Sequence, residues 1–155
     1  MKRALLVLTL MAIASTVSAA DRWGLSIWGL SYHVDRRVDY NEDNWGLGVR
    51  YYFKPDRLFL EFDALRNSNR GLVLPLSLGA EFRIAPLPVG CKLFAVAALT
   101  AAYYQYPNRN TADFKIGPVP GVAVGCGHLK GNVMAVLRKS SEPLAALTAS
   151  LTIVF

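Results

Sequence analysis

Beyond residue 20 the sequence contains no run of about 18 apolar residues, because a charged residue, a glycine or a proline interrupts every longer apolar stretch. This absence excludes a membrane protein built from transmembrane helices, each of which needs roughly 20 apolar residues in succession. Yet 53% of the residues are hydrophobic and the mean hydropathy is positive. A transmembrane β-barrel reconciles these observations, since only alternate residues of each strand face lipid.

The sequence also has few cysteines and histidines and only a small net charge. The chain has two cysteines and two histidines, and their spacing does not match a zinc site. Its 17 basic and 11 acidic residues give a formal net charge of +6. So small and scattered an excess gives no reason to expect nucleic-acid binding. The sequence predicts no metal and no cofactor.

The N-terminus has the pattern of a cleavable signal peptide. Lys2 and Arg3 precede an apolar stretch over 4–14, and the small residues Val17-Ser18-Ala19 follow it. The stretch is too short to span a bilayer as an anchor. We therefore predict a signal peptide over 1–19, cleaved after Ala19 or Ala20, and one barrel domain over 20–155. Export of this kind predicts the outer membrane of a Gram-negative bacterium.

The C-terminus alternates apolar and polar residues with the period of a β-strand. From Leu147 to Phe155 every second residue is apolar, so the apolar residues share one face of the strand, and the sequence ends on an aromatic residue. The last strand of an ordinary soluble sheet would also alternate in this way. Together with the signal peptide and the hydropathy, the pattern favours an outer-membrane barrel whose last strand, ending at Phe155, is recognised by the barrel-assembly machinery.

Eight strand-like segments follow one another, separated by turn-forming residues. They cover 23–33, 44–53, 58–66, 71–84, 92–104, 114–125, 129–137 and 144–155. Bacterial single-chain barrels use even strand counts, and eight is the smallest common one. The predicted fold is therefore all-β, an eight-stranded antiparallel up-and-down transmembrane β-barrel, which we expect to be a monomer.

An even strand count places both ends of the chain on the periplasmic side, with the tight turns, while the longer polar joins face outward. Cys91 begins the fifth strand and Cys126 ends the sixth, so the two lie opposite each other in one hairpin at the periplasmic mouth. In an oxidising compartment this predicts a disulfide bond.

One histidine and one serine are expected at the same outer rim. His33 ends the first strand, and Ser68 lies in the join between the third and fourth strands. A serine becomes a nucleophile when a base lies beside it, and histidine is the usual base near neutral pH. Acidic residues that could orient such a histidine are Asp35, Asp39, Glu42 and Asp43. The alternative is a pair of solvated polar residues without a catalytic role.

Charged residues also occur inside the predicted strands. Glu61 and Asp63 share one face of their strand, which we expect to be the lumen because charge is tolerated there. Arg50 and Arg83 are candidate partners, and a buried polar network is the favoured interpretation.

Two prolines, Pro118 and Pro120, interrupt the sixth strand. Proline has no N–H to donate to the strand ladder, so we expect a gap in pairing in the outer half of the wall. Such a gap would form a lateral gate through which a lipid chain reaches the lumen. A bulge at the strand end is the alternative.

Several of these segments resemble the lipid A palmitoyltransferase (PagP) family, an eight-stranded outer-membrane barrel that moves a palmitoyl chain from a phospholipid to lipid A. The resemblance covers the mature chain in patches and is most specific at Tyr-Asn-Glu. The segments are Ser31-Tyr32-His33, Tyr40-Asn41-Glu42-Asp43-Asn44-Trp45-Gly46-Leu47-Gly48, Leu65-Arg66-Asn67-Ser68, Pro118-Val119-Pro120 and Gly131-Asn132-Val133.

The resemblance implies that His33 and Ser68 form a catalytic pair and that Asn67 stands where the family has its catalytic Asp. An amide cannot hold a developing imidazolium as a carboxylate can. The leading hypothesis is an acyltransferase acting on two outer-membrane lipids, phospholipid and lipid A. The alternatives are a lipid A deacylase and a non-catalytic barrel that stabilises the envelope or binds an apolar ligand.

Overall fold

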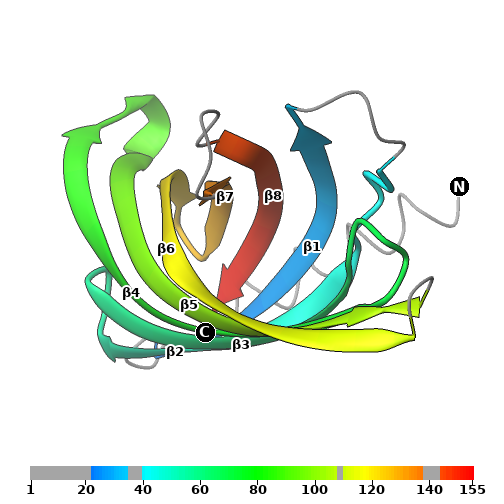
Figure 1. Ribbon diagram of the computed structural model, residues 1–155. Helices are drawn as coiled ribbons and strands as arrows, with labels where there is room; N and C mark the ends of the chain where they lie inside the picture. Colours follow the sequence, from blue (N-terminus) through cyan, green and yellow to red (C-terminus); the bar gives the residue numbers. More distant parts are fainter. Residues whose placement is uncertain (1–21, 35–39, 108–109, 138–143) are drawn as a thin grey trace, which may run out of the picture.

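The computed structural model describes residues 22–34, 40–107, 110–137 and 144–155. Within these ranges eight antiparallel strands form a closed barrel in chain order, with β8 pairing back to β1. Figure 1 shows this ring, in which the red β8 lies beside the blue β1. The predicted all-β, eight-stranded up-and-down architecture is confirmed.

The strand bounds follow the sequence pattern closely. Three strands, β1, β3 and β7, have the predicted bounds, and the β5–β6 hairpin is longer than predicted. The strands are β1 (Trp23–His33), β2 (Gly46–Lys54), β3 (Leu58–Arg66), β4 (Leu72–Pro86), β5 (Lys92–Tyr106), β6 (Thr111–Cys126), β7 (Leu129–Leu137) and β8 (Leu144–Val154). A single 3-10 turn, η1 (Pro88–Gly90), joins β4 to β5.

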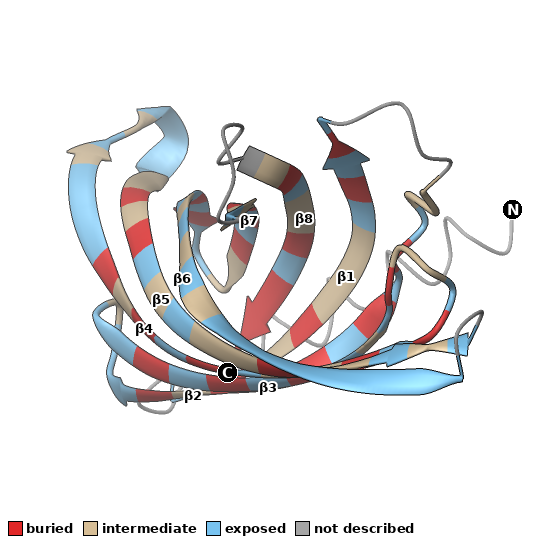
Figure 2. Ribbon diagram, in the orientation of Figure 1, coloured by how far each residue is buried: buried red, intermediate tan, exposed pale blue. Residues whose placement is uncertain are grey.

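The two faces of the barrel wall differ in polarity in the opposite sense to a water-soluble protein. Buried and exposed residues alternate along much of the wall in Figure 2, whereas the first part of β6 is exposed throughout. The exposed positions are mostly apolar, with Trp45 66% and Leu47 56% exposed. The buried positions include charged residues, with Arg50 only 2% exposed. An apolar exterior around a polar lumen is the pattern of a transmembrane barrel.

The first strand begins and the described chain ends at one end of the barrel, which we call the terminal end. Trp23 and Phe155 exchange two backbone hydrogen bonds there, of 3.0 and 2.7 Å. The Cys91–Cys126 disulfide bond, also at this end, confirms the prediction from the sequence. The opposite end, where β1 finishes at His33, is the distal end. The predicted signal peptide over 1–19 lies outside the described residues.

The terminal half of the lumen holds a network of buried charges, which we call the lumen network. Arg50 lies 2.8 Å from Glu61 and 3.0 Å from Glu81, and Lys130 lies 2.7 Å from Glu81. Tyr52 adds its hydroxyl group, which accepts from Arg50 and donates to Glu81, at 3.1 Å in both cases. The expected partner Arg50 is thus present in the lumen.

Two further charged side chains, Arg83 and Asp63, were expected in or near the lumen network. Arg83, the other expected partner of the lumen carboxylates, is instead exposed near the terminal end of β4, where it pairs with Phe94 of β5. Asp63 lies on the same face of β3 as Glu61, two residues nearer the distal end, and accepts a 2.7 Å hydrogen bond from the indole N–H of Trp28.

Among the described residues, no helix is long and apolar enough to cross a bilayer.

Candidate functional site

A bulge in β1 directs His33 into the barrel. Gly24, Ser26 and Trp28 face inward, so strict alternation would turn residue 33 outward. The β1–β8 register shifts between Trp28 and Leu30, and beyond the shift Ser31 and His33 are the buried residues. A bulge inserts one residue and re-aims the side chains that follow it. The extra residue is Gly29, a signal in the sequence that our prediction missed.

Ser68 lies in the turn between β3 and β4, and its hydroxyl group contacts the ring of His33. Ser68 Oγ is 2.7 Å from His33 Nε2, although the two residues are 35 positions apart. The turn places Ser68 at the distal end, where β1 also finishes. The structure therefore brings together the histidine and serine that the sequence analysis singled out, at hydrogen-bond distance. This is the geometry in which a base can take the proton of a hydroxyl nucleophile.

The segment 40–45 crosses beside the distal end of β1 and completes the surroundings of His33. The β1–β2 register ends at Trp28 and Gly46, and beyond it Ser31 N–H donates to Glu42 O at 2.9 Å. The ring of Tyr40 stacks on that of His33 with centroids 4.5 Å apart. Glu42 also accepts the backbone N–H of His33 at 3.1 Å through its carboxylate.

The expected carboxylate partners of His33 fall in two groups. Asp35 and Asp39 lie outside the described residues. Glu42 contacts the backbone of His33, as above, and Asp43 accepts the side-chain N–H of Asn41 through its carbonyl oxygen at 2.9 Å.

Asn67 organises the turn that carries Ser68. Its Oδ1 accepts the backbone N–H groups of Asn69 and Gly71, both at 2.9 Å, as in an Asx turn. Its Nδ2 donates to Gln105 O at 2.7 Å and to Leu72 O at 3.3 Å. An aspartate in this place would point a carboxylate oxygen at two carbonyl oxygens. The amide therefore suits this position for a structural reason.

Pairing between β6 and β7 stops halfway up the wall. The register runs from Cys126–Leu129 to Gly121–Met134, and the described residues form no pair across this seam further toward the distal end. Pro118 and Pro120 lie just beyond the last pair, and both are exposed. β6 continues there through its pairing with β5 alone. The gap in pairing expected from the two prolines is present.

Several inward-facing residues toward the candidate site are small or apolar. They include Ala98, Ala102, Val119, Met134 and Ala146. Trp28, Ala98 and Val119 pack against the apolar cluster that contains Met134. The ion pairs of the lumen thus lie in its terminal half, and between them and the candidate site small apolar side chains accompany the buried Asp63.

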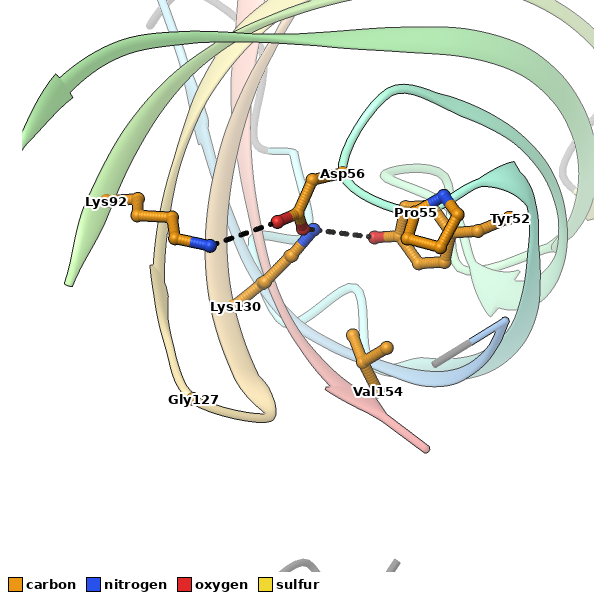
Figure 3. A pocket seen from close by; sticks show the side chains of 7 residues that line it. All are labelled: Tyr52, Pro55, Asp56, Lys92, Gly127, Lys130 and Val154. Carbon is orange, nitrogen blue, oxygen red and sulfur yellow. Dashed lines mark hydrogen bonds and ion pairs between the residues drawn. The ribbon is translucent and has the colours of Figure 1, made fainter. Parts of the chain in front are cut away.

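A separate polar pocket lies at the terminal end. Figure 3 shows its lining, in which Asp56 stands between Lys92 and Lys130. The pocket has a cavity volume of about 120 Å³. Asp56 contacts Lys130 at 2.7 Å and Lys92 at 3.3 Å. Because Lys130 also belongs to the lumen network, these ion pairs extend the network to the terminal mouth.

Asp56 makes the stability of this end dependent on pH. Burial tends to raise the pKa of Asp56, but the hydrogen bonds and charges of Lys130 and Lys92 outweigh it and hold the pKa below its ordinary value. The folded state therefore gains stability from the carboxylate above about pH 4, the unfolded-state pKa, and loses it as pH falls further.

We expect Asp56→Asn to lower the free energy of unfolding at pH 7 by at most about 1 kcal/mol, because the ion pairs are partly exposed. The difference from the wild type should shrink as pH falls from about 5 to 3. Urea unfolding in lipid vesicles, followed by tryptophan fluorescence, measures it. A difference that stays constant over this range would contradict the assignment.

Comparison with known proteins supports the fold. The structure is similar to the N-terminal β-barrel domain of Pseudomonas aeruginosa OprF, with a TM-score of 0.51 and 12% sequence identity. The match covers 89% of this chain and 100% of that domain. No family model matches the sequence, and no curated protein sequence matches it.

Proposed function

We propose that this protein is an outer-membrane enzyme that transfers a fatty acyl chain from a phospholipid to lipid A. The observation that carries the proposal is the 2.7 Å contact between Ser68 Oγ and His33 Nε2. Both groups lie at the distal end, near small inward-facing side chains such as Ala102 and Ala146 and near an unpaired seam in the wall. A nucleophile, a base and a lateral route for a lipid chain are among the parts that acyl transfer needs.

The proposed location rests on the wall and the two ends of the chain. The exterior is a belt of exposed apolar side chains, and the fold is that of a known outer-membrane barrel domain. The signal peptide predicted over 1–19 and the aromatic end at Phe155, as a signal for the barrel-assembly machinery, agree with export to that membrane. In this orientation the distal end faces the outer leaflet, where lipid A is found.

The proposed acyl transfer proceeds in two steps, acylation of Ser68 and transfer of the acyl group to lipid A. His33 Nε2 takes the proton of Ser68 while Ser68 Oγ bonds to the carbonyl carbon of the phospholipid ester. The bond from that carbon to the glycerol oxygen breaks, and the glycerol oxygen leaves with the proton from His33. A hydroxyl oxygen of lipid A then bonds to the acyl carbon while its proton passes to His33, the bond from that carbon to Ser68 Oγ breaks, and Ser68 Oγ takes the proton back from His33. Water in place of lipid A would make the same site a hydrolase.

Pro118 and Pro120 contribute by keeping the β6–β7 seam open as a lateral gate. If the ladder continued in the same register, Val119 would pair with Val136. A disulfide bond in the Val119→Cys, Val136→Cys variant is therefore expected to close the seam and reduce transfer by about 10-fold or more, because the chain could no longer reach the reacting position.

Transfer assays on oxidised and reduced protein measure the effect of the engineered bond. Reduction should restore the activity of the double variant. Wild-type protein treated in parallel controls for reduction of Cys91–Cys126. Full activity of the oxidised double variant would argue against passage through this seam.

Mass spectrometry of lipid A, with and without the gene, tests the proposed function. An added acyl mass that depends on the gene supports transfer, and a lost acyl mass identifies a deacylase instead. An unchanged profile favours the non-catalytic barrel, for which the engagement of Asn67 in the turn, rather than with His33, is the specific argument. Complementation with the Ser68→Ala variant distinguishes chemistry from an indirect effect of the barrel on the envelope.

A further inference from the structure

Two asparagines of segment 40–45 contact Ser68, Asn41 through its backbone N–H, which donates to Ser68 O at 2.9 Å, and Asn44 through its side chain. Asn44 Nδ2 lies 2.7 Å from Ser31 Oγ and 3.4 Å from Ser68 Oγ. Asn41 Nδ2 lies 3.0 Å from Asn44 Oδ1. Asn44 is buried, and the contacts connect β1, the segment 40–45 and the β3–β4 turn. None of these side-chain contacts follows from the sequence spacing.

A backbone carbonyl group determines which atoms donate in the hydrogen bonds that connect Asn41, Asn44 and the two serines. Asn41 contacts the carbonyl oxygen of Asp43 at 2.9 Å, and a carbonyl can only accept. The nitrogen of Asn41 must therefore lie on that side, and the same nitrogen faces Asn44. Asn44 consequently presents its oxygen to Asn41 and its nitrogen to the two serines.

This polarity has a consequence for Ser68. A serine hydroxyl group has one hydrogen to donate and lone pairs to accept with. Asn44 donates toward Ser68 Oγ and so cannot accept the hydroxyl hydrogen of Ser68, whereas His33 Nε2, at 2.7 Å from the same oxygen, can accept it in one of its two neutral tautomers. A nitrogen that accepts this hydrogen must be unprotonated, so the proton of the neutral imidazole sits on Nδ1.

We propose that Asn44 is a positioning residue, which turns the hydroxyl hydrogen of Ser68 toward His33 and thereby selects the imidazole tautomer with an unprotonated Nε2. In this role an amide does part of the work for which serine hydrolases use a carboxylate, since that group also holds the imidazole in its productive tautomer. The inference rests on the proposed function only in taking Ser68 as the nucleophile and His33 as its base.

Two substitutions at position 44 test the inference in the full chain. Asn44→Ala removes the donor, and Asn44→Asp replaces it with an acceptor that competes with His33 for the hydroxyl hydrogen of Ser68. Both should slow labelling of Ser68 by a fluorophosphonate probe by about 10- to 100-fold, since a misdirected nucleophile reacts less often. Asn69→Asp introduces the same charge in the adjacent turn, where Asn69 contributes its backbone N–H to the Asx turn, and should change the rate less than about twofold.

A second readout separates positioning from a structural role. In protein labelled with ¹⁵N-histidine, His33 of the wild type should show an acceptor-type Nε2 and a protonated Nδ1, and Asn44→Asp should shift this balance toward protonated Nε2. His128→Gln assigns the signals, because the chain has two histidines. Heat-modifiable migration on a gel verifies folding of each variant.

The labelling rate of Ser68 and the tautomer of His33 together distinguish failure of this inference from failure of the proposed function. Slower labelling with an unchanged His33 tautomer would overturn the inference, as would an unchanged labelling rate in both variants at position 44. Failure of wild-type Ser68 to react with the probe would count against the proposed function, while the tautomer of His33 in the wild type and in Asn44→Asp would still decide whether Asn44 directs the hydrogen bond.

Discussion

Replacing His33 or Ser68 by alanine is expected to reduce acyl transfer by about 10²- to 10⁴-fold, the range associated with loss of a general base. The reason is the 2.7 Å contact between Ser68 Oγ and His33 Nε2, which makes each group dependent on the other. Without the base the hydroxyl group keeps its proton, and without the hydroxyl group the base has nothing to activate. Folding should be little affected, since both residues lie at the distal end, away from the lumen network.

The double variant gives the sharper result. Groups that act as one unit are strongly non-additive, so His33→Ala combined with Ser68→Ala should be no slower than either single variant. The assay uses purified protein in mixed micelles, a phospholipid with a labelled acyl chain and lipid A as acceptor. Losses that multiply in the double variant would show that the two residues act separately, and substantial activity in Ser68→Ala would remove serine as the nucleophile.

Asn67→Asp provides a matched comparison at the neighbouring residue. If Asn67 were a weakened catalytic carboxylate, restoring aspartate would raise activity. The structure leads us to expect the opposite, because Nδ2 of Asn67 donates to the carbonyl oxygens of Leu72 and Gln105, which a carboxylate would repel. We expect lower activity with the turn disturbed, measured in the same transfer assay. Higher activity would assign Asn67 a direct role beside His33.

The barrel could be predicted from local pattern because its strands obey a simple rule. Period-two alternation bounded by turn residues defined β3 and β7 to the residue, and the bounds of β1 were also predicted although its alternation shifts at the bulge. The rule fails where polar residues pair for a tertiary reason. Thr111 and Asp113 have the composition of a loop, yet they pair with Tyr106 and Tyr104 and lengthen the β5–β6 hairpin.

The candidate site was predictable in its position and not in its geometry. Topology alone placed His33 and Ser68 at one end, because strand β1 finishes where the β3–β4 turn lies. The inward direction of His33 depends on a bulge at Gly29, and a lone glycine in a strand does not specify a bulge until its pairing with β8 is known. The role of Asn44 depends on contacts between segments far apart in the sequence.

Removal of Arg50 is expected to cost the barrel about 3–5 kcal/mol in free energy of unfolding, the range for breaking a buried ion pair. Arg50 is the partner of Glu61 at 2.8 Å and of Glu81 at 3.0 Å, and its guanidinium also lies 4.2 Å from the ring centroid of Phe59. In Arg50→Met, Glu81 keeps its contact with Lys130, whereas Glu61 is left with the hydroxyl group of Ser26 and no counter-charge from Arg50. Urea unfolding in lipid vesicles measures the loss.

A second substitution identifies the source of the cost. If the penalty comes from a buried carboxylate that has lost its counter-charge, Arg50→Met combined with Glu61→Gln should recover more than half of the lost stability, because a neutral amide still accepts a hydrogen bond from Ser26. Arg83→Met is the matched control, since the same change at an exposed position near the terminal end of β4 should stay within about 0.5 kcal/mol of the wild type.

Losses that simply add in the double variant would mean that Arg50 stabilises by packing alone. Recovery would instead show that the lumen network persists as a set of mutually compensating charges. The lumen network in the terminal half and the unpaired β6–β7 seam in the distal half would then be separate features of the barrel, because the charges that stabilise the fold lie away from the part of the wall where strand pairing stops.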